Sequence, residues 1–175
     1  MAGPPLEVIA APLTREGFAP FGEVVSAGLG QGAAAAAVAN QGTAVRFDWS
    51  AALESTRAGA RPNLAVFRST PQPLPLALKL LERHPHSTQT FLPMIASRYL
   101  VCVAPDDRDG GPDLARLRAF ICGPGLGVNY RRGLWHHPIV ALEAVAEFAV
   151  LIWEDGSTGD CEERPLPAPI LVRGG

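Results

Sequence analysis

The sequence predicts an all-β protein built as a barrel or sandwich of short strands. Short apolar or alternating runs recur along most of the chain, and turn-forming residues separate them. The 175 residues include 18 Gly and 17 Pro, which are spread evenly and leave little room for long helices. A chain of this length is expected to form one domain, residues 1–175, with a core of its own.

The charge and cysteine content exclude several classes of protein. The formal net charge is −2, with 15 basic and 17 acidic residues and no basic stripe, so we expect neither a nucleic-acid nor a membrane partner. Cys102 and Cys122 lie in apolar runs and predict buried thiols, whereas Cys161 stands in a polar segment. This spacing favours neither a disulfide framework nor a zinc site. Without a secretory signal or an uninterrupted apolar span, a cytoplasmic protein is expected.

The first part of the chain predicts short elements. Residues 7–11 form a brief apolar stretch. Thr14 can cap a single helical turn over residues 15–18, because its hydroxyl can accept from an unpaired N–H. A strand is expected over residues 21–25. The Gly- and Ala-rich segment 28–38 favours a helix or a loose loop about equally.

The rest of the chain predicts strands and turns. Residues 40–47 place polar groups around a turn-forming glycine, as at the entry of a hairpin. Three prolines between residues 71 and 75 exclude a helix or a central strand there. Further strands are expected at residues 64–68, 78–82, 88–93, 99–104, 117–122, 139–142 and 148–153. The last of these is apolar on both faces, which predicts deep burial, and a turn at 155–160 leads into a Pro-rich tail.

Two polar clusters predict one pocket. The first spans residues 82–91, and the second spans residues 127–138 with two histidines, two arginines, a tyrosine and a tryptophan. Imidazoles titrate or bind metal near neutral pH, and guanidiniums grip carboxylates through paired hydrogen bonds. The second cluster alone is equally typical of a solvated rim loop. The presence of both clusters favours a pocket.

The spacing within these clusters resembles the two motifs of cupin barrels. The first cupin motif is H-x-H, four residues, then E, and the second is G, five residues, then P-x-G-x-x-H. The positions that match in spacing, though not always in residue type, are Glu82, His84, Gln89, Gly125, Arg131, Gly133 and His136. Ligands two residues apart on a strand point to the same side. The resemblance implies a cupin-type antiparallel β-barrel with few short helices.

Longer matches resemble the ureidoglycolate lyase family and run in collinear order over most of the chain. They are Phe18–Val24, Asn40-Gln41-Gly42 with Arg46, His84-Pro85-x-Ser87-Thr88-Gln89-x-Phe91-x-Pro93, Pro112–Leu114 with Leu117–Phe120, Gly127–Tyr130 with Trp135–Pro138, and Asp160–Glu163. The segment Gly28–Val38 has no counterpart in this pattern. The resemblance implies cleavage of (S)-ureidoglycolate to glyoxylate and urea during allantoin and purine breakdown, by a homodimer.

That reaction needs a base near the substrate hydroxyl, an acid near the leaving nitrogen and a cation for the carboxylate. Glu82, His84 and His136 are the expected acid–base residues. The expected substrate-binding residues are Asn40, Arg46, Gln89, Tyr130 and Arg132. Tyr130 and Trp135 are equally compatible with a place in the core. His137 is expected to point away from His136 because neighbouring side chains on a strand alternate.

A metal site remains an open alternative. Glu82, His84, Gln89 and His136 would offer one carboxylate, two imidazoles and one amide. This set could hold one divalent ion such as Ni²⁺ or Mn²⁺, less tightly than three histidines and a glutamate would. A barrel mouth that binds substrate without metal is equally compatible with these residues.

Two other functions fit the same scaffold. An amidohydrolase would release ammonia from the same substrate, but that chemistry commonly uses two metals and the chain has only four histidines. A non-catalytic cupin that binds a small ligand is the second alternative. It would not require the full acid–base set of Glu82, His84 and His136.

Overall fold

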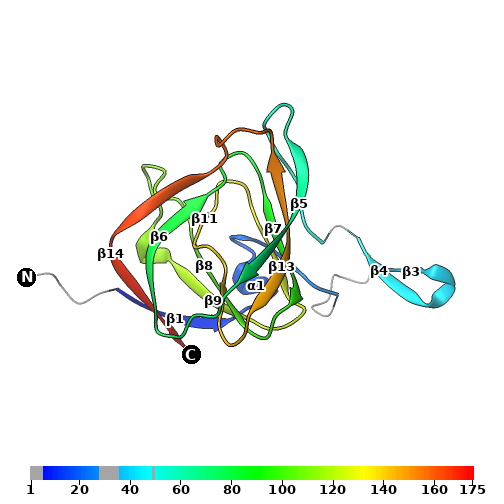
Figure 1. Ribbon diagram of the computed structural model, residues 1–175, viewed down its shortest axis with the longest axis horizontal. Helices are drawn as coiled ribbons and strands as arrows, with labels where there is room; N and C mark the ends of the chain where they lie inside the picture. The colour runs from blue at the N-terminus through cyan, green and yellow to red at the C-terminus, as the bar shows by residue number, and fades with distance from the viewer. Residues whose placement is uncertain (1–5, 28–35, 49) are drawn as a thin grey trace, which may run out of the picture.

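The computed structural model describes residues 6–27, 36–48 and 50–175 (Figure 1). The first elements are β1 (Glu7–Pro12), the single helical turn α1 (Arg15–Phe18), β2 (Gly22–Val25), β3 (Ala36–Ala39), the 3₁₀ turn η2 (Asn40–Gly42), β4 (Ala44–Phe47), β5 (Arg61–Ser69), β6 (Leu76–Arg83) and β7 (Gln89–Ile95). They are followed by β8 (Tyr99–Ala104), the 3₁₀ turn η3 (Leu114–Arg116), β9 (Arg118–Cys122), β10 (Gly127–Tyr130), β11 (Trp135–His136), β12 (Val140–Ala141), β13 (Ala146–Glu154) and β14 (Glu162–Gly174).

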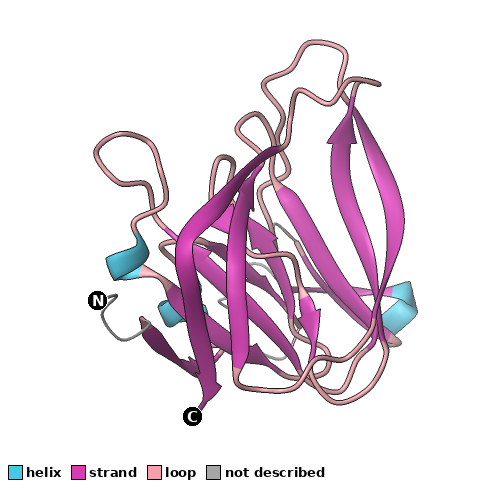
Figure 2. Cartoon of the chain, turned by 60° about the vertical axis from the view of Figure 1, so that its left-hand side comes forward, coloured by secondary structure: helices cyan, strands magenta, loops and turns pink. Residues whose placement is uncertain are grey.

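Two sheets face one another and form the barrel (Figures 1 and 2). The larger sheet has the order β11-β6-β14-β1-β9-β8-β12, and the smaller one has the order β2-β10-β7-β13-β5. Strand β11 also pairs with β8, which closes the larger sheet into a ring. The predicted all-β barrel is therefore confirmed. Most pairings are antiparallel, and β1 runs parallel to both β14 and β9.

Strand β8 separates two cores, and all of its side chains are buried. Leu100, Cys102 and Ala104 belong to the apolar cluster inside the ring. Tyr99 and the two valines of β8 point the other way, into the cluster shared with the five-stranded sheet. The alternation of side chains along a strand therefore divides the molecule into two packed layers.

Several local predictions are confirmed. The Thr14 hydroxyl accepts a hydrogen bond from the Gly17 N–H at 3.0 Å and caps α1. Cys102 and Cys122 are buried free thiols, and Cys161 is exposed. No helix among the described residues is long and apolar enough to cross a membrane.

The sequence predicts a Pro-rich tail after residue 160, but Glu162–Gly174 forms a strand instead. This strand, β14, is the longest in the described chain. It pairs antiparallel with β6 and parallel with β1. Its pairing with β6 shifts register between Pro165 and Ile170. Proline has no N–H to donate, and this irregularity lets the strand carry its prolines without breaking the sheet.

The predicted deep burial of residues 148–153 on both faces is also wrong for the isolated chain. Phe148 and Val150 are fully buried, but burial alternates along β13, and Ala149 and Leu151 are only half-buried. These two side chains line an outward-facing groove of about 470 Å³. Of the segment 28–38, residues 28–35 lie outside the described part of the chain, and the remaining three belong to β3.

Truncation of Leu78 should test the ring core. Its side chain is fully buried, so Leu78→Ala removes apolar contacts and leaves a cavity, at a cost of about 2–5 kcal/mol in the free energy of unfolding. The matched control is Leu6→Ala, because Leu6 is 45% exposed and a surface change should stay within about 0.5 kcal/mol. Urea denaturation followed by circular dichroism measures both. Equal stabilities of the two variants would contradict the assigned core.

Candidate active site

Two strands of the ring bring the acid–base candidates together. His136 on β11 is the cross-strand partner of Glu82 on β6. Their chain neighbours Trp135 and Leu81 belong to the ring core. Because side chains alternate, Glu82 and His136 point to the other side, into the space between the two sheets. His84 follows Glu82 by two residues, as the motif spacing requires.

The three side chains converge at short range. The Nε2 atom of His136 lies 3.4 Å from Oε1 of Glu82, and the rings of His84 and His136 have centroids 5.5 Å apart. One potential ligand atom from each of the three residues lies within 4.8 Å of the other two. The sequence spacing thus identified three residues that the fold brings together.

Backbone carbonyls orient both imidazoles. The Nδ1 atom of His84 lies 2.6 Å from the Asp160 carbonyl oxygen, and Nδ1 of His136 lies 2.9 Å from that of Leu134. A carbonyl oxygen can only accept, so each Nδ1 carries the proton and each neutral ring presents an unprotonated Nε2. Both Nε2 atoms are buried and make no hydrogen bond within the described structure. The rings are therefore held with free lone pairs directed at the site.

The surroundings fix the charge states of Glu82 and His84. Burial alone would raise the pKa of the Glu82 carboxyl, but the neighbouring imidazoles, His136 foremost with His84 and His137, together outweigh burial and hold that pKa below its ordinary value. For His84, burial and then the neighbouring His136 lower the imidazole pKa. At neutral pH, Glu82 is therefore an anion and His84 is neutral. This combination suits proton acceptance or metal binding.

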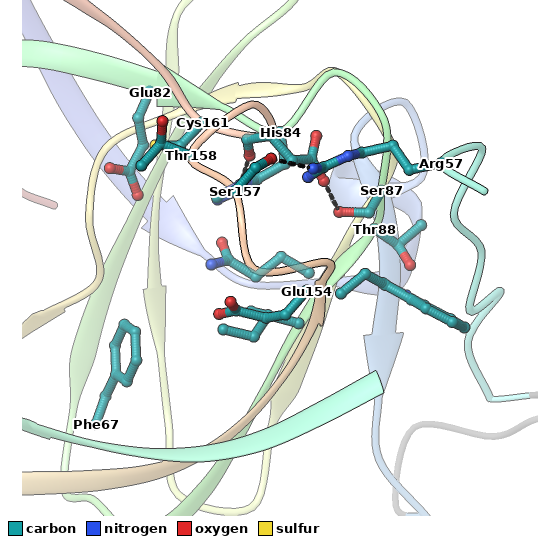
Figure 3. A pocket seen from close by; sticks show the side chains of 14 residues that line it. Arg57, Phe67, Glu82, His84, Ser87, Thr88, Glu154, Ser157, Thr158 and Cys161 are labelled. Carbon is teal, nitrogen blue, oxygen red and sulfur yellow. Dashed lines mark hydrogen bonds between the residues drawn. The ribbon is translucent and has the colours of Figure 1, made fainter. Parts of the chain in front are cut away.

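A pocket of about 280 Å³ opens beside Glu82 and His84 (Figure 3). Gln89, at the start of β7, also lines it; its side chain is buried and its Oε1 has no hydrogen-bond partner in the described chain. The opposite wall comes from the end of β13 and the turn that follows. Residues there and nearby that complete the lining include Arg57, Ser87, Trp153, Glu154, Ser157, Thr158, Asp160 and Cys161.

Asp160 is a residue of the pocket wall that the sequence reasoning did not single out. Its carboxylate accepts from the His86 N–H at 2.8 Å and from the Ser87 hydroxyl, and its carbonyl orients His84. It therefore ties the segment after β6 to the turn before β14. The signal was available, because Asp160 stands in one of the matches to the lyase family. No role followed from it, since the tail was interpreted as irregular.

The pocket is rich in anions. Glu82, Glu154 and Asp160 line it, and Arg57 is the one guanidinium among the described lining residues. Arg57 is paired with Asp155 and donates to the Ser157 hydroxyl. The loop before β5 supplied no motif from which Arg57 could have been predicted. An anionic substrate would therefore find no unpaired guanidinium in this wall.

The fold does not bring Asn40, Arg46 or Arg132 to this pocket. Asn40 and Arg46 lie on the hairpin of β3 and β4, which projects away from the barrel (Figure 1). Arg132 lies at the surface, 4.0 Å from a carboxylate oxygen of Glu54. Tyr130 is buried in the core and stacks on the His136 ring with centroids 4.4 Å apart. It therefore supports the imidazole from beneath rather than lining the pocket.

Trp135 lies where alternation along β11 predicts. Trp135 is buried in the ring core, and its indole N–H donates to the Gly110 carbonyl at 3.3 Å. His137 lies outside the cluster of Glu82, His84 and His136, and its Nδ1 lies 2.7 Å from the Pro138 carbonyl oxygen.

The three converging residues fit a divalent metal ion. Two imidazole nitrogens with free lone pairs and one ionised carboxylate are ligand types that such ions accept, and their backbone partners fix the ring orientations as in metal sites. The unpaired Oε1 of Gln89 lies in the same pocket wall. The structure thus contains a possible metal-binding cluster of two histidines and one glutamate.

The closed barrel and the histidine–carboxylate cluster between its sheets define a cupin-type protein. The sequence matches the family model for ureidoglycolate lyase over residues 5–173, and the chain belongs to this family. It is 44% identical over 155 residues to a ureidoglycolate lyase of Burkholderia cepacia, covering 88% of this chain and 83% of the relative. It is 39% identical to a ureidoglycolate lyase of Rhizobium etli strain CIAT 652, covering 93% of each chain. A dTDP sugar isomerase from Desulfovibrio desulfuricans is a weaker structural match, with 16% identity, a TM-score of 0.44, and 70% of this chain and 80% of that chain covered.

The titration of His84 should test the charge state of the site. In metal-free protein we expect its imidazole pKa to lie below the ordinary value of about 6.5, since burial disfavours the charged ring. His136→Ala should move this pKa upward, because it removes the neighbouring imidazole that lowers the His84 pKa and admits water. Two-dimensional NMR of the imidazole C–H signals measures both. A His84 pKa at or above the ordinary value in the unmodified protein would contradict the geometry.

Proposed function

We propose that this chain cleaves (S)-ureidoglycolate into glyoxylate and urea, a step in the breakdown of allantoin. The observation that carries the proposal is the convergence of Glu82, His84 and His136 at one pocket, in a member of the ureidoglycolate lyase family. The substrate is a carbinolamide that bears a carboxylate. Its cleavage needs one proton removed from the hydroxyl and one delivered to the leaving nitrogen.

The site contains one group that can accept the hydroxyl proton and a second that can deliver a proton to the leaving nitrogen. The Glu82 carboxylate, with its lowered pKa, is ionised and can accept the hydroxyl proton. As the aldehyde carbonyl forms, the bond between carbon and the urea nitrogen breaks, and that nitrogen needs a proton. His136, 3.4 Å from Glu82, lies where it can share the accepted proton and return it to the leaving group. The proton removed from oxygen thus ends on urea.

His84 and Gln89 would position the substrate. The neutral His84 ring offers Nε2 as an acceptor for an N–H of the urea group, and the Gln89 amide offers both a donor and an acceptor. Both polar groups are buried and unpaired within the described chain, and an unpaired buried polar group costs about 1–3 kcal/mol. Substrate would satisfy them, which favours binding of a ligand with several hydrogen-bonding groups.

A divalent ion such as Ni²⁺ or Mn²⁺, if bound, would be held by Glu82, His84 and His136, with Gln89 as a further ligand. When bound, it would lower the pKa of the substrate hydroxyl and attract the carboxylate. Glu82 and the two imidazoles would then act as ligands. We also propose that the protein is a cytoplasmic homodimer, as the family resemblance implies.

The two alternatives are not favoured. An amidohydrolase or a non-catalytic binding protein would not be expected to match curated ureidoglycolate lyases over most of its length. A coupled assay that measures urea and ammonia separately distinguishes all three functions. We expect urea and glyoxylate in equal amounts without ammonia. Ammonia release would identify the amidohydrolase, and binding without any product would identify the non-catalytic protein.

Substitution of His136 should lower turnover more than binding. We expect His136→Ala or Glu82→Gln to reduce kcat by about 10²–10⁴-fold, because each removes a group that carries the proton in the reaction. Steady-state urea release measures the effect. The control is His137→Ala, since His137 lies outside the cluster. If His137→Ala lost as much turnover as His136→Ala while remaining folded, the proton carrier would be wrongly assigned.

A further inference from the structure

The hairpin of β3 and β4, which we term the arm, stands apart from the barrel (Figure 1). Its two four-residue strands form a separate two-stranded sheet and contact mainly one another and the intervening turn η2. A two-stranded hairpin is marginally stable in water unless another surface covers it. The arm carries Val38 and Val45, which are 77% and 57% exposed. An apolar hairpin of this kind needs a surface to pack against.

The backbone at the tip of the arm turns through two residues with positive φ angles. Asn40 and Gln41 both have positive φ angles, 49° and 58°. Asn adopts this conformation more readily than most residues, and consecutive positive φ angles are typical of the tight turn that joins two hairpin strands. The Asn40 carbonyl accepts from the Thr43 hydroxyl at 2.8 Å, and the Asn40 side-chain amide has no hydrogen bond within the described chain. The tip therefore exposes the Asn40 side chain to its surroundings.

The barrel has a matching uncovered surface along β5, the edge strand of the smaller sheet. On its outer face Leu64 and Val66 are 70% and 61% exposed. Leu64 lies beside Leu92 of β7 and Leu151 of β13 around the outward-facing groove, and Val66 is the cross-strand partner of Ala149, which also lines that groove. The sequence predicts that both faces of β13 are buried. In this chain only the face with Phe148 and Val150 is fully buried. An exposed apolar edge of this length is a site for pairing with another chain.

The uncovered edge is next to the active-site pocket. Phe67 on β5 packs against Phe91 with ring centroids 5.8 Å apart and also lines the pocket. By strand alternation Phe67 lies on the face of β5 opposite Leu64 and Val66, so one edge strand carries the exposed apolar face on one side and a pocket residue on the other. Strand β5 therefore contributes both to the exposed apolar surface and to the wall of the pocket.

The third observation is the difference in charge between the pocket wall and the arm. The pocket wall is rich in carboxylates and its guanidinium, Arg57, is paired with Asp155. Arg46 on the arm is paired with Asp48, but both side chains are largely exposed, at 67% and 40%. An exposed pair of this kind contributes at most about 1 kcal/mol, so Arg46 is readily redirected to another anion. The arm thus carries the kind of cation that the pocket lacks.

We propose that two copies of this chain exchange arms. The arm of each copy packs on the β5 edge of the other and carries Asn40 and Arg46 to that copy's pocket, where Arg46 binds the substrate carboxylate. The role of Arg46 toward substrate rests on the proposed function, whereas the exchange of arms does not. Each active site is then built from two chains, and an isolated chain has an incomplete site.

Mixed dimers test the exchange directly. Chains carrying His136→Ala and chains carrying Arg46→Glu are co-expressed with different affinity tags, and dimers holding both tags are purified. One site of each mixed dimer then combines an intact barrel with an intact arm. We expect about half of the wild-type urea release per dimer, because a two-fold dimer has two equivalent sites. Each parent variant alone should be at least about 10-fold less active at low substrate concentration, since it loses a charged contact or a proton carrier.

Three results would overturn the proposal: mixed dimers no more active than their parents, an Arg46→Glu protein as active as the wild type, or a chain that forms no dimers. The matched control is Arg98→Glu, since Arg98 is likewise an exposed arginine paired with a nearby carboxylate, Glu143. It should leave urea release unchanged.

A readout without substrate separates this proposal from the proposed function. We expect a chain with both Val38→Asp and Val45→Asp to sediment as a folded monomer, because the charges disrupt the apolar arm contact while leaving its own barrel intact. The control Ile9→Asp, at a 59% exposed site on β1, should remain dimeric. If the double variant stays dimeric, the arm is not the contact. If the wild type dimerises through the arm but releases no urea, only the proposed function fails.

Discussion

The architecture of the site depends on one very short strand, β11, which pairs with β6 and β8 at once. These pairings close the ring and set the direction of both side chains of the strand. Trp135 points into the ring core and is 1% exposed, so the position of the strand is fixed by packing. His136 must then point between the sheets, opposite Glu82. The apolar core thus determines where the imidazole lies, and the chemistry uses a geometry that packing has already established.

The charges of the site follow from this placement. A carboxylate next to two buried imidazoles remains ionised, and the carbonyls behind the rings leave both Nε2 atoms unprotonated when neutral. The same arrangement creates a difficulty, because the substrate is an anion and the pocket wall is acidic. A divalent ion at the cluster or Arg46 from a second copy would resolve this difficulty. Both solutions add positive charge, but only Arg46 would leave Glu82 and His136 free to carry protons, because a metal ion would take them as ligands.

The sequence predicted the parts of this structure that depend on short-range periodicity. The strands, the cap of α1, and the shared side of Glu82 and His84 follow from spacing along the chain, whereas the convergence with His136 was expected from the resemblance to the two cupin motifs. Contacts that depend on distant pairing were not accessible in this way. The prolines of β14 concealed a strand that pairs across the sheet, Asp160 acts from the end of the turn that precedes it, and the arm carrying Asn40 and Arg46 lies apart from its own barrel. Strand β13 is apolar on both faces, but its outer face, with Ala149 and Leu151, is only half-buried in this chain.

The central claim is that the reaction takes place between Glu82, His84 and His136. A crystal structure of the protein with bound glyoxylate tests it most directly. We predict that the aldehyde carbon lies within about 3.5 Å of a side-chain atom of Glu82 or His136, the distance expected for reacting groups. The glyoxylate carboxylate should face away from the pocket wall, toward the mouth. Glyoxylate held instead in the surface groove lined by Arg116, Arg118 and Arg131, with the pocket free of it, would contradict the account.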